Sequence, residues 1–150
     1  MKQVSAAAVM VWVFAVLVAA EGPDRKYIVL PRVVASKAPF SDAVLKGDTL
    51  YVSGHIGIDQ KTGKPGATPE EEARLVMESV KRAVEAGGMS MDDLVSVTVF
   101  CSDVSYYDVF NGVYRTYFHD NYPARAFIGS GKLLFGARFE VQGIAVKRGQ

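Results

Sequence analysis

The sequence predicts an α+β domain in which a mixed β-sheet carries two helices on one face. β-rich runs alternate with two segments whose apolar residues recur at three- and four-residue spacing, in the order β, β, β, α, β, α, β, β. Hairpin turns join some of the strands and helices connect others, which favours a sheet with both strand directions. At 150 residues, 49% of them hydrophobic, the chain has the size and core of one ordinary domain.

The first strands lie in the N-terminal third of this domain. Residues 27–30 are β-rich and are stopped by Pro31, which predicts a short or edge strand. Strands 43–45 and 49–53 then flank the three-residue, glycine-containing loop 46–48, so they are expected to form a hairpin.

A turn-rich stretch and a helix follow. Residues 54–66 contain several glycines and a proline, and we expect turns and a solvent loop there. Thr68 suits an N-cap, with Pro69 at the first helical position and Glu71 completing a capping box, and Gly87-Gly88 ends the helix. The apolar residues of this predicted helix are Ala73, Val76, Val80, Ala83 and Val84.

The second half of the chain repeats the alternation of strand and helix. Residues 94–101 are β-branched and predict a sheet strand, and a second helix is expected from near Ser105 to the stop at 121–123. Two terminal strands are predicted at 125–128 and 138–147. No internal repeat or linker interrupts residues 21–150, which we take as a single domain.

The N-terminal 20 residues have the order of a secretory signal peptide. Lys2 precedes an uninterrupted apolar run over 6–20 that ends in small residues, which predicts cleavage after Ala20 and an exported protein, periplasmic or secreted. The alternative is an uncleaved membrane anchor, although the run is shorter than the roughly 20 residues of a spanning helix. Cleavage removes one of the 17 Lys and Arg and leaves 16 against 16 Asp and Glu, so the mature chain would be neutral and without stable membrane association.

Charge and residue counts exclude several classes of function. A net charge of +1 gives no electrostatic footprint for nucleic acid, so no nucleic-acid partner is expected. Cys101, His55 and His119 are too few and too scattered for a structural metal site, and no metal or cofactor is expected. On spacing alone, each His is an ordinary loop or surface residue. An exported protein tolerates one unpaired cysteine if Cys101 is buried.

Two features of the chain could carry chemistry. Pro123-Ala124-Arg125 opens a predicted strand, and in the last strand Arg138, Glu140 and Gln142 share the face opposite the one occupied by their apolar neighbours. The pattern alone also fits a surface arginine and a solvated strand face.

These residues bring out a resemblance to a known family. Residues 51–54 (Tyr-Val-Ser-Gly), Asn111, residues 122–125 (Tyr-Pro-Ala-Arg) and Glu140, fifteen positions after Arg125, resemble the RidA (YjgF-like) family, which is also labelled endoribonuclease L-PSP. The resemblance spans about residues 36–147. It implies a chorismate-mutase-like fold and a homotrimer with clefts between subunits.

The activity that the resemblance implies is cofactor-independent hydrolysis of reactive enamines or imines, such as 2-iminobutanoate and 2-iminopropanoate, to 2-keto acids and ammonia. Arg125 would hold the substrate carboxylate through two parallel N–H···O bonds, a geometry that lysine lacks. Glu140 would position the attacking water or relay its proton. Ser53 and Asn111 would contribute hydrogen bonds at the substrate or support the cleft wall.

Three residues depart from the pattern of the deaminase branch. Phe40 stands where a tyrosine is common, Phe127 where a cysteine is common and His55 where a glutamine is common. We expect all three at the substrate cleft, with His55 turned toward it. Two additional phenylalanine rings would make the cleft more apolar and shift its preference toward apolar imines, unless the rings simply fill the space.

Two alternatives to the deaminase remain open. A protein of the same fold could capture a small carboxylate on Arg125 without turning it over. The older family label names a ribonuclease activity, which the neutral mature charge and the lack of a basic groove disfavour.

Overall fold

The computed structural model describes residues 25–31, 38–119 and 121–148. The predicted signal peptide over 1–20 lies outside these residues. Within them, no helix has the length and apolar character needed to cross a membrane.

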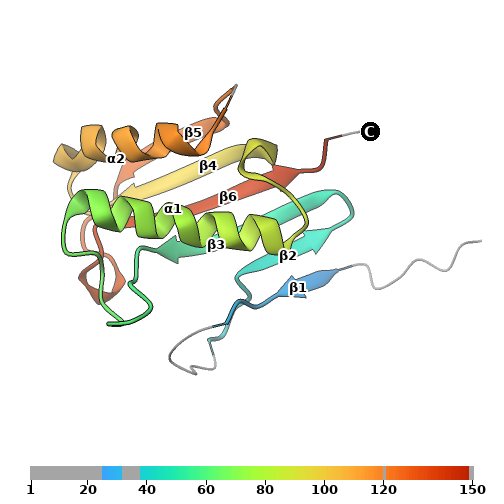
Figure 1. Cartoon of the computed structure of the whole chain (residues 1–150), viewed down its shortest axis with the longest axis horizontal. Coiled ribbons are helices and arrows are strands. Elements are labelled where there is room, and N and C mark those ends of the chain that lie inside the picture. Colours follow the sequence, from blue (N-terminus) through green and yellow to red (C-terminus); the bar gives the residue numbers. More distant parts are fainter. Residues whose placement is uncertain (1–24, 32–37, 120, 149–150) are drawn as a thin grey trace, which may run out of the picture.

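Six strands form one mixed sheet with the order β1-β2-β3-β6-β4-β5 (Figure 1). β4 and β5 are parallel, and every other neighbouring pair is antiparallel. β1 occupies one edge and β5 the other, as the proline stop after the first run predicted for β1. The strands are β1 (Lys26–Ile28), β2 (Ala43–Lys46), β3 (Thr49–Ile56), β4 (Leu94–Cys101), β5 (Ala124–Gly129) and β6 (Phe139–Val146).

Helix α1 (Pro69–Ala86) begins and ends where its capping residues predict. The Thr68 side chain accepts the Glu71 backbone N–H at 3.1 Å, and the Glu71 carboxylate accepts the Ala67 N–H at 2.9 Å. Together these bonds satisfy two donors at the helix start. Gly88 follows the helix with a φ of +78°, a conformation that glycine adopts without strain.

Helix α2 (Tyr107–Tyr114) is shorter than the predicted segment. Short 3-10 turns at 104–106 and 115–117 account for the remaining helical residues. Asp103, rather than Ser105, caps this region by accepting the Ser105 N–H at 2.9 Å. The apolar pattern identified the helical region, but its spacing does not separate α-helical from 3-10 turns.

Both helices cover the same face of the sheet, as Figure 1 shows, which confirms the predicted α+β arrangement. On that face β4 and β6 contribute fully buried side chains, including Val99, Cys101 and Phe139. Cys101 is thus buried, which is the condition under which an exported protein tolerates an unpaired cysteine. No helix of the described residues lies over the opposite face, and apolar side chains there, such as Tyr51 and Ile128, remain 51% and 42% exposed.

One strand differs from its prediction in a way that shapes the site. β3 continues through Gly54 to Ile56, where the sequence predicted turns. The register against β6 shifts between Val52 and His55, so the strand contains a bulge at Ser53-Gly54. The glycine suggested a turn, but backbone pairing with β6 keeps the segment in the sheet while the bulge bends it.

Candidate active site

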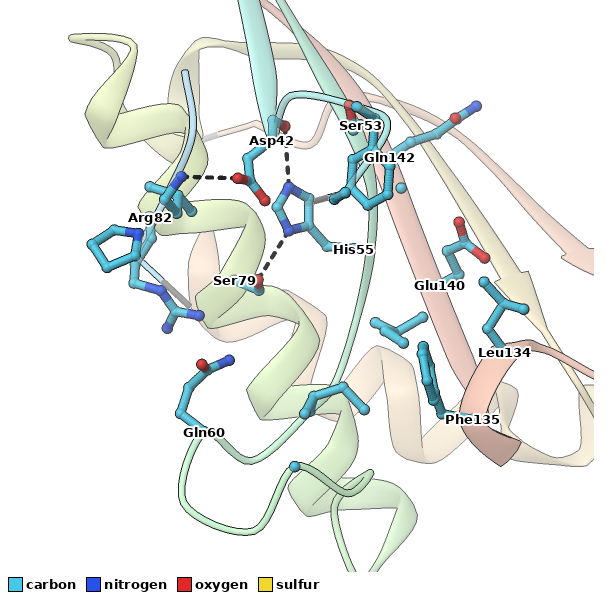
Figure 2. A pocket seen from close by; sticks show the side chains of 18 of the residues that line it. Asp42, Ser53, His55, Gln60, Ser79, Arg82, Leu134, Phe135, Glu140 and Gln142 are labelled. Carbon is cyan, nitrogen blue, oxygen red and sulfur yellow. Dashed lines mark hydrogen bonds between the residues drawn. The ribbon is translucent and has the colours of Figure 1, made fainter. Parts of the chain in front are cut away.

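A cavity of about 1020 Å³ lies beside the bulge of β3 and the start of β6 (Figure 2). Four of the seven residues predicted for the substrate site line it: Phe40, Ser53, His55 and Glu140. Segments distant in sequence complete the wall, among them Asp42, Ser79, Arg82, Leu134, Phe135 and Gln142.

The Glu140 side chain lies directly over the backbone of Gly54. A methyl group added at Gly54 would collide with the Glu140 carboxylate, whose Cδ would be only 3.0 Å away. Only glycine therefore allows this approach. Beside it, the Ser53 hydroxyl donates to the Ser41 carbonyl at 2.6 Å, which fixes the side chain at the cavity wall.

A buried carboxylate on α1 fixes the backbone that carries Glu140. Glu72 is fully buried and accepts the backbone N–H groups of Arg138 and of Phe139, the latter at 3.1 Å. The Arg138 guanidinium donates to the same carboxylate at 2.7 Å. Glu140 follows immediately in β6, so α1 determines where this residue enters the cavity.

His55 is buried on the helix side of β3, which corrects the expectation of a loop or surface residue. Its Nε2 lies 3.2 Å from the Asp42 carbonyl, which can only accept, so Nε2 carries the hydrogen. Nδ1 forms a hydrogen bond with the Ser79 hydroxyl at 2.9 Å. His55 borders the cavity, and its two nitrogens join β3 to Asp42, just before β2, and to Ser79 of α1 (Figure 2). His119, by contrast, is exposed and bonded to Asp92.

Arg125 lies on β5 against the aromatic side chains of α2. Its guanidinium carbon is 4.5 Å from the centre of the Tyr114 ring, and farther out it approaches the rings of Tyr107 and Phe127 at 5.9 and 5.8 Å. Burial raises the pKa of Tyr114 to about 12. The ring is therefore neutral near pH 7 and offers the cation its face.

Asn111 and Phe127 belong to this same cluster rather than to the cavity. Phe127 packs edge-on against Tyr107 with ring centres 5.0 Å apart and against Phe110 at 5.7 Å. Asn111 is buried on α2, one helical turn from both Tyr107 and Tyr114 and thus on the same helix side.

The register of the sheet places Arg125 and Glu140 on opposite faces. Arg125 pairs with Val97 on β4, whereas Glu140 pairs with Phe100, three residues farther along. Because side chains alternate along a strand, partners of Val97 and of Phe100 point to opposite sides. One chain thus brings Ser53, His55 and Phe40 to Glu140, but not Arg125, Asn111 or Phe127.

Arg125 and Glu140 have one property in common. Each is half-buried, and within the described residues neither forms a hydrogen bond or an ion pair. Arg125 instead lies against ring faces. Charged groups that are half removed from water are normally paired. The two side chains therefore have hydrogen-bonding capacity left for a ligand.

The sequence reasoning missed Leu134 and Phe135, which line the cavity beside Glu140 (Figure 2). They lie in a short 3-10 turn and are 70% and 76% exposed. A signal was present, because Leu133-Leu134-Phe135 is an apolar run between two glycines where neither strand nor helix was predicted. Among the residues placed in the structure, no cluster of three or more His, Cys, Asp or Glu could hold a metal.

Comparison with known proteins assigns the chain to a family. The profile of the family described as Endoribonuclease L-PSP matches residues 31–147, so the chain belongs to that family, the RidA (YjgF-like) proteins. The predicted resemblance is thereby confirmed.

Individual members of the family are similar over most of their length. The 2-iminobutanoate/2-iminopropanoate deaminase of Rattus norvegicus is 36% identical over 125 residues, covering 82% of this chain and 90% of the relative. The solved YjgF gene product of E. coli has 31% identity and a TM-score of 0.76, with 82% of this chain and 99% of that one covered. E. coli TdcF, solved with bound serine, has 31% identity and a TM-score of 0.75, with 82% and 100% covered.

Proposed function

We propose that this protein is a hydrolase that deaminates 2-imino acids, or their enamine tautomers, to 2-keto acids and ammonia without a cofactor. The observation that carries the proposal is the half-buried Glu140 carboxylate, which lies on the Gly54 backbone beside Ser53, at a cavity, and has no hydrogen-bond or ion-pair partner among the described residues. The names of relatives such as the Rattus norvegicus deaminase support this chemistry.

The residues suit the two requirements of the reaction. Arg125 would bind the substrate carboxylate with two N–H donors, its guanidinium plane held by the Tyr114 ring. Glu140 would take a proton from water as the oxygen adds to the imine carbon, and would return that proton to the nitrogen. The second proton of the added water, which is on the new hydroxyl group, then passes to the nitrogen as the carbon–nitrogen bond breaks and the carbonyl forms. One imino acid and one water thus yield one keto acid and one ammonia.

We further propose that the complete site forms between copies of the chain in a homotrimer. Arg125 and Glu140 lie on opposite faces of one sheet, so a second copy is required to bring them to one substrate. The sheet face opposite α1 and α2 carries exposed or half-exposed apolar side chains, including Tyr51, Phe100 and Ile128. Contact between copies would remove this apolar surface from water.

Two finer proposals concern substrate and location. Phe40 lines the cavity and is 51% exposed, which supports a preference for apolar imines. The order of charge, apolar run and small residues over 1–20 supports export with cleavage after Ala20, the uncleaved anchor being the alternative. An exported deaminase would require an exported source of imines, such as an oxidase of amino acids.

The test is a coupled assay in which an amino-acid oxidase generates imines in situ from several amino acids. We expect the wild type to accelerate keto-acid release and Arg125→Ala and Glu140→Gln each to abolish most of it. Mixing these two variants after dissociation should restore about a quarter of the wild-type activity, because a quarter of the shared sites then contain both intact residues.

The other outcomes separate the alternative functions. Saturable keto-acid binding that Arg125→Ala abolishes, without any acceleration of release, would identify a carboxylate-binding protein. Cleavage of RNA that depends on Glu140, with no deamination, would support the ribonuclease named by the family description. Full activity of a monomer, or no recovery on mixing, would overturn the shared site.

A further inference from the structure

Three large apolar side chains stand at the cavity that contains Glu140. Phe40, Leu134 and Phe135 are 51%, 70% and 76% exposed, and all three line this cavity. We refer to them as the apolar rim. In Figure 2, Leu134 and Phe135 lie beside Glu140. So many exposed apolar carbons at one cavity are unfavourable in water unless they contact a ligand or another protein surface.

The backbone of Phe135, one residue of the apolar rim, has an energetically unfavourable conformation. Phe135 has a φ of +57°, and it is the only non-glycine residue with positive φ among those described. A bulky side chain rarely adopts this conformation, which asparagine and glycine tolerate much better. The surrounding turn therefore keeps Phe135 in an unfavourable geometry, as is typical of residues at functional sites.

The cavity has room for a substrate side chain next to the rim. Its volume is about 1020 Å³ with the phenylalanine rings in place, several times what a three-carbon acid needs. The rings therefore border the space instead of filling it. Phe127 differs, because its ring packs into the α2 cluster on the other side of the sheet.

We propose that the apolar rim makes this protein selective for 2-imino acids with a large apolar side chain, aromatic ones above all. This inference rests on the proposed deaminase function and names its substrate class. With the reacting carbon near Glu140, the side chain would lie against Leu134, Phe135 and Phe40. Each buried methylene favours binding about fourfold, and aromatic pairs add to this.

The first experiment measures binding without turnover, by calorimetry with two stable keto-acid products, phenylpyruvate and pyruvate. The full-length chain should bind phenylpyruvate at least about tenfold more tightly than pyruvate. Phe135→Asn keeps a residue that tolerates positive φ and removes the ring, so it should reduce this preference about fivefold without loss of folding. Val104→Asn is the matched control, since Val104 is 60% exposed and lies outside the cavity, and it should leave the preference unchanged.

The second experiment compares kcat/KM for the imines derived from phenylalanine and alanine in the same three proteins. Equal kcat/KM values for both imines, or equal effects of the two asparagine variants on their ratio, would overturn the proposed selectivity. The proposed deaminase function would then still stand. Keto-acid preference that depends on Phe135, with no turnover of any imine, would retain the selectivity and reject the deaminase. A change in assembled mass in Phe135→Asn alone would show that the rim contacts another copy of the chain, and would overturn the inference.

Discussion

The two charged residues of the site are held by different kinds of structure. Arg125 lies on the edge strand β5 beside α2, where the ring of Tyr114 packs against its guanidinium. Glu140 lies at the cavity beside β3 and β6, where a bulge, a glycine and the Glu72 hydrogen bonds set its position. Ring contacts fix the plane of a cation and leave its N–H groups available, whereas backbone hydrogen bonds fix a position closely. The first arrangement suits ligand capture and the second suits proton transfer.

The largest effect is expected at Glu140, the residue proposed to carry the proton. Glu140→Gln should lower kcat about 10²- to 10⁴-fold with a small change in KM, because the amide keeps its shape but cannot carry a proton. Steady-state kinetics with in situ generated imines measures both constants. Equal losses in binding and turnover would instead assign Glu140 a structural role.

The backbone beside Glu140 should lose more stability when its buried polar support is removed than α1 loses when an exposed ion pair is removed. Glu72→Ala leaves the Arg138 charge and two backbone N–H groups without their acceptor, and should lower the free energy of unfolding by about 3–5 kcal/mol. Glu70→Ala removes an acid from the same helical turn, but its ion pair with Arg74 is exposed, so the loss should stay below about 1 kcal/mol. Urea unfolding of both variants tests the difference, and similar losses would contradict it.

At the sheet edge, the shape of the cation should matter more than its charge. Arg125→Lys keeps the charge and replaces a planar, two-pronged donor with a point charge, so kcat/KM should fall about 10- to 100-fold with an unchanged fold. Keto-acid binding should weaken in parallel, unlike in Glu140→Gln. A lysine variant with near-normal turnover would exclude the carboxylate-binding role.

The smallest effect is expected away from both regions. Hydrogen bonds from His119 hold the pKa of Asp92 below its usual range. A lowered pKa in the folded state adds stability above about pH 4 that is lost as the pH falls through the folded value. Asp92→Asn should therefore cost no more than about 0.5 kcal/mol at pH 7 and nothing at about pH 2, since the pair is solvent-screened. Urea titrations at both pH values test this, and activity should not change.

Local sequence signals determined most of the secondary structure. The Thr68-Pro69 start and the glycine stop predicted α1, and the β-branched run over 94–101 predicted β4 with its observed bounds. Alternation in the last strand identified Glu140 on the face opposite the buried residues. These features depend on residues close in the chain, whose capping bonds and side-chain periodicity do not need the rest of the fold.

Only the tertiary structure decided which of these residues meet. The bulge in β3 depends on pairing with β6, about 90 residues later. The residues next to Gly54 in the sequence therefore predicted a turn. The burial of His55 depends on Ser79 of α1, and the apolar rim depends on a turn near Glu140. Family resemblance predicted Arg125 and Glu140 as partners, but the register that puts them on opposite faces of one sheet is a long-range property. Strand pairing across the sheet, which no local pattern encodes, is the physical reason that one chain holds the two residues apart.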